Sequence, residues 1–224
     1  MYRKRNPKAA GKIGVANKLS AISCITIHPY YFSWQKRVFD VSISGIAFVV
    51  GFPFLVAIAA AVLFFSGPPI FFGQKRVGKG KKPFVMWKFR TMELNAAKEQ
   101  KKYLRYNEAP APMFKMRNDP RYTRIGKFLS ATGVDELPQL WNILRGEMSV
   151  VGPRPLPMKE ARLLNNSWQF RYQIKPGIVS EWAIDQTRYQ SLAKWQTLEK
   201  NTLTHGDIVY DFSLITRTFF YLAR

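Results

Sequence analysis

Residues 41–74 read VSISGIAFVVGFPFLVAIAAAVLFFSGPPIFFGQ and contain no charged side chain. Basic side chains flank this apolar stretch on both sides. Residues 1–37 hold eight Lys or Arg and no acid, and residues 75–90 hold seven and no acid. Since about 20 consecutive apolar residues in a helix reach across the hydrocarbon core of a bilayer, the stretch is long enough to enter a membrane.

The positive charge on both flanks indicates how the apolar stretch would enter a membrane. An ordinary spanning helix carries most of its neighbouring Lys and Arg on the cytoplasmic side, whereas here both flanks are basic. Pro53 removes a backbone donor and favours a kink. We therefore predict a re-entrant membrane element over residues 36–72, with two helices separated by a break near Pro53. A single spanning helix and a buried core helix are the alternatives.

The composition limits the class of protein. The chain has 224 residues, with 35 Lys+Arg against 14 Asp+Glu, and a formal net charge of +21. Hydrophobic residues make up 47%, which is too many for a disordered basic tail. A single cysteine and two histidines exclude a disulfide scaffold and make a Cys- or His-based metal site unexpected. These features predict an intracellular protein that attracts anions: nucleic acid, phosphorylated small molecules or an anionic membrane surface.

We expect three parts in the chain: a basic, mobile segment over residues 1–35, the membrane element over 36–72, and a cytosolic domain over 73–224. The fold class predicted for the domain is α/β and helix-rich, with amphipathic helices at the membrane interface. The predicted elements are a strand over 83–89, an exposed helix over 91–107, a loop over 108–113 and a helix over 121–132. Most aromatic side chains of the C-terminal third are expected in the core.

The segment with the densest chemical signal spans residues 134–155. Its apolar residues Leu137, Leu140, Trp141 and Leu144 share one helical face. Asp135 and Glu136 then fall at the start of that helix, where they either cap it or, as an adjacent pair, hold Mg²⁺ and supply a nucleophile or a base.

Arg154 lies between Pro153 and Pro155, which restrict the backbone on both sides of it. A guanidinium held in this way is suited to binding phosphate through two hydrogen bonds.

The order of the motifs along residues 36–180 resembles that of the bacterial sugar transferases, the small monotopic phosphoglycosyl transferases that use polyprenyl phosphate. The motifs are KRVFD (36–40), FGQKRVG (72–78), KFRTM (88–92), DELPQL (135–140), MSVVGPRP (148–155) and a weaker KPGI (175–178).

The resemblance implies an enzyme that transfers a sugar 1-phosphate from a nucleotide sugar, usually a UDP-sugar, to polyprenyl phosphate at the cytoplasmic face of the inner membrane. It implies Asp135 as nucleophile and Mg²⁺ contact, and Glu136 as its acid/base partner. Arg154 maps to the phosphate-binding arginine of the family, and further contacts to the diphosphate are expected from Lys88, Arg90 and Arg76. The expected cofactor is Mg²⁺ and the expected partners are nucleotide sugar, polyprenyl phosphate and anionic lipids, without nucleic acid.

The sequence also departs from the family pattern. Five residues before the nucleophile, where family members usually have an arginine, this chain has Ser130. Two residues before the nucleophile, where serine is common, it has Gly133. Residues 179–185 and the last 40 residues match poorly. A catalytically weak or inactive relative that acts as a scaffold in glycan assembly is therefore the first alternative, and an unrelated basic membrane or nucleic-acid-binding protein is the second.

Overall fold

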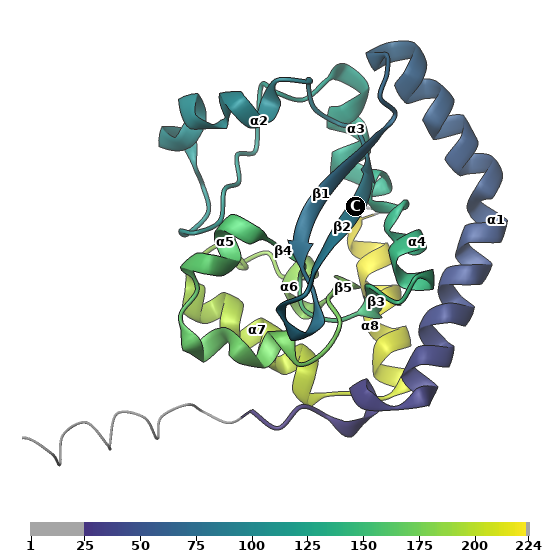
Figure 1. Cartoon of the computed structure of the whole chain (residues 1–224), viewed down its shortest axis with the longest axis vertical. Coiled ribbons are helices and arrows are strands. Elements are labelled where there is room, and N and C mark those ends of the chain that lie inside the picture. The colour runs from purple at the N-terminus through teal and green to yellow at the C-terminus, as the bar shows by residue number, and fades with distance from the viewer. Residues whose placement is uncertain (1–24, 223–224) are drawn as a thin grey trace, which may run out of the picture.

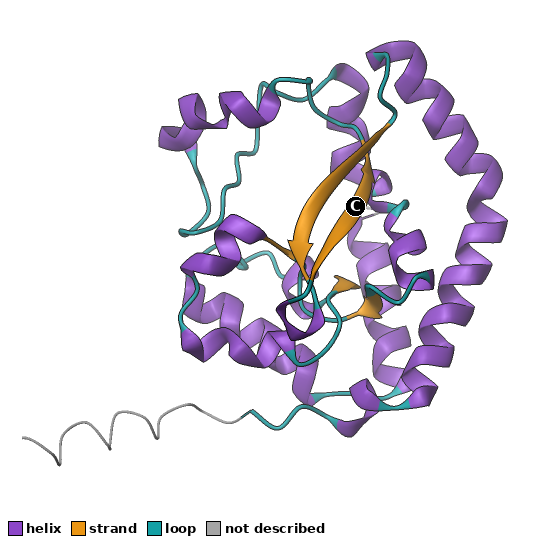
Figure 2. Cartoon of the chain, in the orientation of Figure 1, coloured by secondary structure: helices purple, strands orange, loops and turns teal. Residues whose placement is uncertain are grey.

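A single long helix, α1 (Trp34–Ser66), arches around the rest of the protein in the computed structural model, which describes residues 25–222 (Figure 1). The remainder is a helix-rich α/β body with two small sheets (Figure 2). Its further α-helices are α2 (Ala96–Glu99), α3 (Arg124–Thr132), α4 (Gln139–Leu144), α5 (Met158–Leu163), α6 (Glu181–Ile184), α7 (Leu192–Thr204) and α8 (Ile208–Leu222). Short 3₁₀ helices are η2 (Pro29–Phe32), η3 (Lys79–Lys81), η4 (Gln100–Tyr106), η5 (Val134–Glu136) and η6 (Asn166–Tyr172).

The ends of α1 are defined by local signals. The Ser33 hydroxyl accepts a hydrogen bond from the Lys36 amide and caps the first turn. The helix stops at Gly67, whose φ of 70° is favoured by glycine. Between these residues the helix continues through Pro53. The sequence predicted two helices separated by a break, and the structure instead has one continuous helix. Pro53 removes only one backbone donor, and the long apolar segments before and after it keep their own backbone hydrogen bonds.

Both ends of α1 are packed against the body. Lys36, Asp40 and Ser44 are buried near its start, and Ile58 and Val62 are buried near its end. The opposite face is apolar and exposed along the helix, with Ile46, Val49, Val50, Phe52, Phe54, Val56, Leu63, Phe64 and Phe65 at the surface. By length and composition α1 is the one helix within residues 25–222 that could cross a membrane.

The first sheet is built on a hairpin. Strands β1 (Phe71–Val77) and β2 (Pro83–Phe89) pair antiparallel around the η3 turn, and β4 (Leu156–Pro157) pairs antiparallel with the other edge of β1. In the second sheet, β3 (Ser149–Val151) pairs in parallel with β5 (Gly177–Val179). These two sheets bring the segments 72–78, 88–92, 148–155 and 175–178 together from distant parts of the chain.

Two motif glycines allow the second sheet to close. A Cβ atom on Gly177 would lie 2.1 Å from the amide nitrogen of Gly152, and a Cβ on Gly152 would lie 2.7 Å from the carbonyl oxygen of Lys175. Both distances are far below van der Waals contact, so only glycine fits at either position. The close approach fixes where the chain continues to Arg154.

Three clusters of buried side chains form the core. One lies under η2 and α7 and contains Trp168, Trp182 and Trp195. A second joins β2, α4, β3 and β5, and a third packs the end of α1 against α3 through Val62 and Leu129.

Most predicted elements are observed with adjusted bounds. The strand over 83–89 is confirmed as β2, and the helix over 121–132 begins later, at Arg124, where the Thr123 hydroxyl caps it. The exposed helix over 91–107 is reduced to α2 and η4, and residues 108–113 form a loop as predicted.

The predicted boundaries of the membrane element and the N-terminal segment need correction. Phe71 and Phe72 belong to β1, because the chain has turned at Gly67 and pairs with β2. Residues 25–35 are part of the folded body, since Tyr31 is buried and its hydroxyl donates to the Thr202 carbonyl at 2.6 Å. The rest of the predicted mobile segment, residues 1–24, lies outside the described residues.

The C-terminal aromatic residues divide between core and surface. Trp182 and Trp195 are buried as expected, whereas Phe212, Phe219 and Phe220 of α8 are exposed. The prediction of a core role therefore fails for the α8 residues, because their face of the helix points away from the body.

Candidate active site

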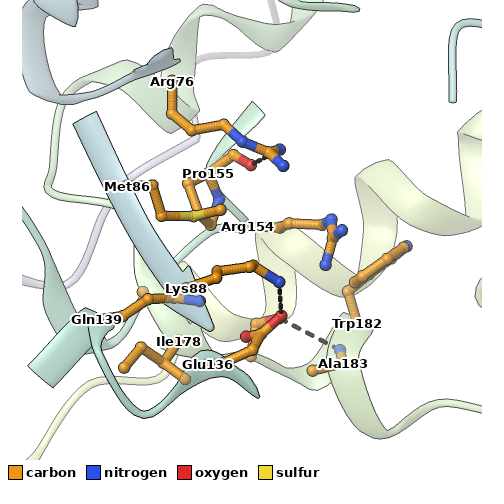
Figure 3. A pocket seen from close by; sticks show the side chains of 12 residues that line it. Arg76, Met86, Lys88, Glu136, Gln139, Arg154, Pro155, Ile178, Trp182 and Ala183 are labelled. Carbon is orange, nitrogen blue, oxygen red and sulfur yellow. Dashed lines mark hydrogen bonds and ion pairs between the residues drawn. The ribbon is translucent and has the colours of Figure 1, made fainter. Parts of the chain in front are cut away.

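A pocket of about 320 Å³ lies between β2, the η5–α4 segment, the loop before β4 and the start of α6 (Figure 3). It contains three basic side chains and one carboxylate. The residues that line it are Arg76, Met86, Lys88, Glu136, Gln139, Arg154, Pro155, Gly177, Ile178, Ser180, Trp182 and Ala183. Four of the six predicted site residues, Arg76, Lys88, Glu136 and Arg154, are thus brought together from separate motifs.

The carboxylate pair lies in the η5 turn directly before α4, close to where the sequence pattern predicts it. Gly133, with φ of 71°, ends α3 and lets the chain turn sharply into η5. Asp135 is 5% exposed and Glu136 is partly exposed. Lys88 of β2 forms an ion pair with Glu136, and its Nζ atom lies 3.7 Å from Asp135 Oδ2. Asp135 does not line the pocket itself, but it is adjacent to Lys88, which does.

The two carboxyl groups differ in pKa. Burial raises the pKa of Asp135 to about 6, against the attraction of Lys88. Removal from water also acts to raise the pKa of Glu136, but the positive charges of Lys88 and Arg154 outweigh it and lower the pKa to about 2. Near neutral pH, Glu136 is therefore a fixed negative charge, whereas Asp135 changes its protonation close to the working range of an enzyme.

Arg154 has its guanidinium free for a ligand. The side chain extends into the pocket, where its Cζ lies 4.8 Å from the centre of the Trp182 ring (Figure 3). Among residues 25–222, no acceptor forms a hydrogen bond with this guanidinium. The Arg154 carbonyl accepts a hydrogen bond from Arg171, which in turn pairs with Glu199 at 3.0 Å.

Arg76 supplies a second buried positive charge. It is 7% exposed, and its Nη1 atom donates to the Pro155 carbonyl at 2.8 Å. Its Nε atom has no partner within the described part of the chain. Burial, and next the charge of Arg154, lower the pKa of Arg76 to about 10, so Arg76 remains charged near neutral pH.

Arg90 lies elsewhere. Its guanidinium donates to the carbonyls of Ser66 and Gly67 at the end of α1, and it does not line the pocket. The position of Arg90 therefore does not support a contact with the diphosphate, because its side chain lies outside the pocket and its Nη2 atom satisfies helix-end carbonyls.

Other residues of the site were missed by sequence reasoning. Trp182, which stacks on Arg154, and the pair Arg171 and Glu199, which holds the Arg154 backbone, come from the C-terminal region that matches no motif. The only signal was the aromatic content of that region. Gln139 lines the pocket and stands inside the motif DELPQL (135–140), from which only Asp135 and Glu136 were predicted as site residues.

Comparison with known proteins identifies the family of the chain. Residues 31–224 match the family model described as "Bacterial sugar transferase". The chain belongs to this family.

Three relatives illustrate the range of the similarity. The exopolysaccharide production protein ExoY of Sinorhizobium fredii is 33% identical over 188 residues, which cover 82% of this chain and 83% of the relative. The galactosyl transferase CpsE of Streptococcus agalactiae is 43% identical over 119 residues, 53% of this chain and 26% of the relative. The UDP-glucose:undecaprenyl-phosphate glucose-1-phosphate transferase of Escherichia coli is 32% identical over 193 residues, 83% of this chain and 39% of the relative. The chain therefore spans most of ExoY but well under half of the two other relatives.

The raised pKa of Asp135 predicts a pH-dependent cost to stability. A carboxyl whose pKa in the folded state exceeds its ordinary value of 3.8 destabilises the fold once it ionises, so the cost grows from about pH 4 to 6 and is constant above. At pH 8 the cost is on the order of 3 kcal/mol, converted at about 1.4 kcal/mol per pKa unit. In EDTA, the thermal unfolding temperature of Asp135→Asn relative to wild type should therefore be higher at pH 8 than at pH 4.5.

Asp119→Asn is the matched control. Burial acts to raise the pKa of Asp119, but its hydrogen bonds with Arg121 lower it overall, so this variant should lose stability at pH 8 and recover relative to wild type as the pH falls below 4. The same pH trend in both variants would contradict the assignment for Asp135.

Proposed function

We propose that the protein transfers a sugar 1-phosphate from a UDP-sugar to polyprenyl phosphate at the cytoplasmic face of the inner membrane and so starts the assembly of a glycan. The observation that carries the proposal is the pocket itself, in which Glu136 lies beside Lys88, Arg76 and an Arg154 without an acceptor, while Asp135 is buried next to Lys88. A diphosphate is the class of ligand that such a group of cations would bind. The names of relatives support the reaction, among them the "UDP-galactose-lipid carrier transferase" of Erwinia amylovora.

In the first step, an ionised Asp135 oxygen attacks the phosphorus that carries the sugar. The bond from this phosphorus to the bridging oxygen breaks, and UMP leaves with the electron pair. The product is a sugar phosphate bound covalently to Asp135. Because attacker and substrate are both anionic, the positive charges of Lys88 and Arg154 would lower the barrier by offsetting their repulsion.

In the second step, a phosphate oxygen of the polyprenyl phosphate attacks the same phosphorus. The bond to Asp135 breaks, the carboxylate is restored, and polyprenyl diphosphate sugar is released. A phosphate oxygen already carries negative charge near neutral pH, so this step needs little help from a base. With a pKa of about 2, Glu136 is better suited to hold Lys88 in place than to transfer a proton, which revises the acid/base role expected from the resemblance.

The residues present fit a Mg²⁺ ion as cofactor. Within residues 25–222 no group of three or more His, Cys, Asp or Glu could hold a metal. Mg²⁺ commonly binds through one or two carboxylates and takes its other ligands from substrate phosphates and water. Asp135, with Glu136 beside it, would hold such an ion, which when bound neutralises the oxygens of the diphosphate.

The proposal includes a re-entrant arrangement of α1. Asp40 near its start is bonded to β3, and Val62 near its end is packed on Leu129 of α3, so both ends contact one body. A helix of 33 residues is about 50 Å long, more than the thickness of the hydrocarbon core. If α1 crossed the bilayer as a straight helix, one of its ends would have to leave the body. If α1 is bent and enters the bilayer from one side only, the contacts at both of its ends are kept.

The same arrangement gives α8 a place at the interface. Its exposed Phe212, Phe219 and Phe220 would lie among the lipid headgroups, while the outer face of α1 would contact the hydrocarbon of the bilayer. The pocket would then open close to the surface where the phosphate of a polyprenyl lipid is found.

Release of UMP tests the reaction. Purified full-length protein in detergent should release UMP from one of a panel of UDP-sugars, and only when Mg²⁺ and polyprenyl phosphate are present. Asp135→Asn should lower the rate at least about a thousandfold because the nucleophile is lost. Glu93→Gln, which changes an exposed carboxylate, should leave it unchanged.

Two results would count against the reaction. Turnover by Asp135→Asn at the wild-type rate would mean that the acceptor attacks the donor directly. No release from any donor by folded protein would favour the inactive, scaffold-like alternative.

The stacking of Trp182 on Arg154 predicts a graded effect. Trp182→Leu should lower kcat/KM for the donor about fivefold because the cation–π contact is removed, and Trp182→Phe, which retains an aromatic face, should lose less than about twofold. Steady-state kinetics on both variants, with unfolding temperatures measured in parallel, would check this. Equal losses in the two variants would show that the ring face does not matter.

A further inference from the structure

A second cavity, of about 600 Å³, lies where the start of α1 meets the η3 turn and the segment before β5. We call it the second pocket. Its lining residues are Tyr31, Phe32, Ser33, Lys36, Arg37, Asp40, Lys79, Ser149, Val151, Ile174 and Lys175. It shares no residue with the candidate active site.

Four cations and one carboxylate line this pocket, and two of the cations are already bonded to other groups of the protein. Lys36 forms ion pairs with Asp40 at 2.8 Å and with Asp211 at 2.7 Å. Arg37 donates to the carbonyls of Ile143 and Leu144 at the end of α4. These partners leave no negative charge for the remaining two cations.

Lys79, which is exposed, and Lys175, which is partly exposed, are the two cations of the lining that have no bonded partner among the described residues. Among the described residues neither amine forms a hydrogen bond or an ion pair, although Lys79 lies over the ring of Phe32. Lys175 Nζ and Arg37 Nη2 each lie 3.6 Å from the position that a Cβ on Gly146 would take, so two cations are close together. Burial, and next the charge of Arg37, lower the pKa of Lys175. An anion in this cavity would relieve that repulsion.

The surroundings indicate the source of the anion. Phe32 is 53% and Trp34 is 72% exposed beside the pocket, and the exposed apolar face of α1 begins with Val38 and Val41. Aromatic side chains next to an apolar helix are typical of the level of lipid headgroups. A phosphate at this depth belongs to a lipid.

We propose that the second pocket binds the phosphate group of an anionic membrane lipid through Lys79 and Lys175, and so fixes the start of α1 at the headgroup level. The ligand is a structural lipid and not the acceptor substrate. The inference rests on the membrane association proposed above, but not on the transfer reaction. A free phosphate ion shares the chemistry, and the experiment separates the two sources.

Titration calorimetry on the full chain in detergent tests the site. The probes are short-chain phosphatidylglycerol, short-chain phosphatidylcholine and inorganic phosphate. Wild type should bind phosphatidylglycerol in preference to both others. Lys79→Gln/Lys175→Gln should weaken that binding at least about tenfold, because two charged contacts to the phosphate are removed.

Two further variants keep the test specific. Lys98→Gln/Lys101→Gln removes the same charge from exposed positions of the α2–η4 region and should change the affinity less than about twofold. Lys79→Arg/Lys175→Arg keeps the charge and should retain binding. Equal losses in the two glutamine double variants would overturn the proposal, since only overall charge would then matter. Absence of phosphatidylglycerol binding by wild type, or inorganic phosphate binding as tightly, would overturn it as well.

Release of UMP from the UDP-sugar, measured with protein and polyprenyl phosphate in detergent, serves as a separate readout. Lys79→Gln/Lys175→Gln should retain the wild-type kcat in detergent, because the second pocket is apart from the reacting groups. Loss of kcat in this variant, with an unchanged unfolding temperature, would show that the pocket serves the substrate and would contradict a structural lipid. Failure of the transfer reaction in wild type would leave the lipid-binding result to be judged on its own.

Discussion

The amine of Lys36 lies between the carboxylates of Asp40 and Asp211 in the interior of the protein, and this three-charge group joins the start of α1 to α8. All three side chains are at most 5% exposed. Asp40 also accepts hydrogen bonds from the Ser149 hydroxyl and the Val150 amide of β3. Removing one member of such a group leaves a buried charge without a partner, at a cost of about 3 to 5 kcal/mol. The network thus fixes α1, α8 and the second sheet with respect to one another.

The position of the catalytic groups follows from that sheet. β3 pairs with β5 at a distance that only Gly152 and Gly177 permit, and the chain leaving β3 at Val151 reaches Arg154 three residues later. From the other side, Glu199 of α7 holds Arg171, and Arg171 holds the Arg154 carbonyl. Glu199, which stands in the region that departs most from the family pattern, therefore supports the backbone of Arg154 through Arg171. Different sequences can provide that support, because a backbone carbonyl requires only a donor.

Much of the site was predictable because its residues stand in compact motifs. The apolar face of residues 137–144 predicted Asp135 and Glu136 at the start of a helix, and the structure has them in η5, directly before α4. The sequence pattern could not predict contacts between segments that are distant in the chain. Nothing in the sequence shows that Arg90 satisfies the end of α1, or that Trp182 stacks on Arg154. The division of the α8 aromatic residues between core and surface also depends on which face the neighbouring elements cover. The break expected at Pro53 failed for a different reason, since the packing of both ends of α1 holds the helix together around one missing donor.

The central claim is that Asp135 carries the sugar phosphate during the reaction. The most direct measurement is the intact mass of the protein after incubation with the active UDP-sugar and Mg²⁺ but without polyprenyl phosphate, followed by peptide mapping. The account predicts an adduct with the mass of one sugar phosphate on the peptide that contains Asp135, its absence in Asp135→Asn, and its loss when polyprenyl phosphate is added. An enzyme that turns over with acceptor present but never forms the adduct would contradict the account, because the acceptor would then attack the donor directly.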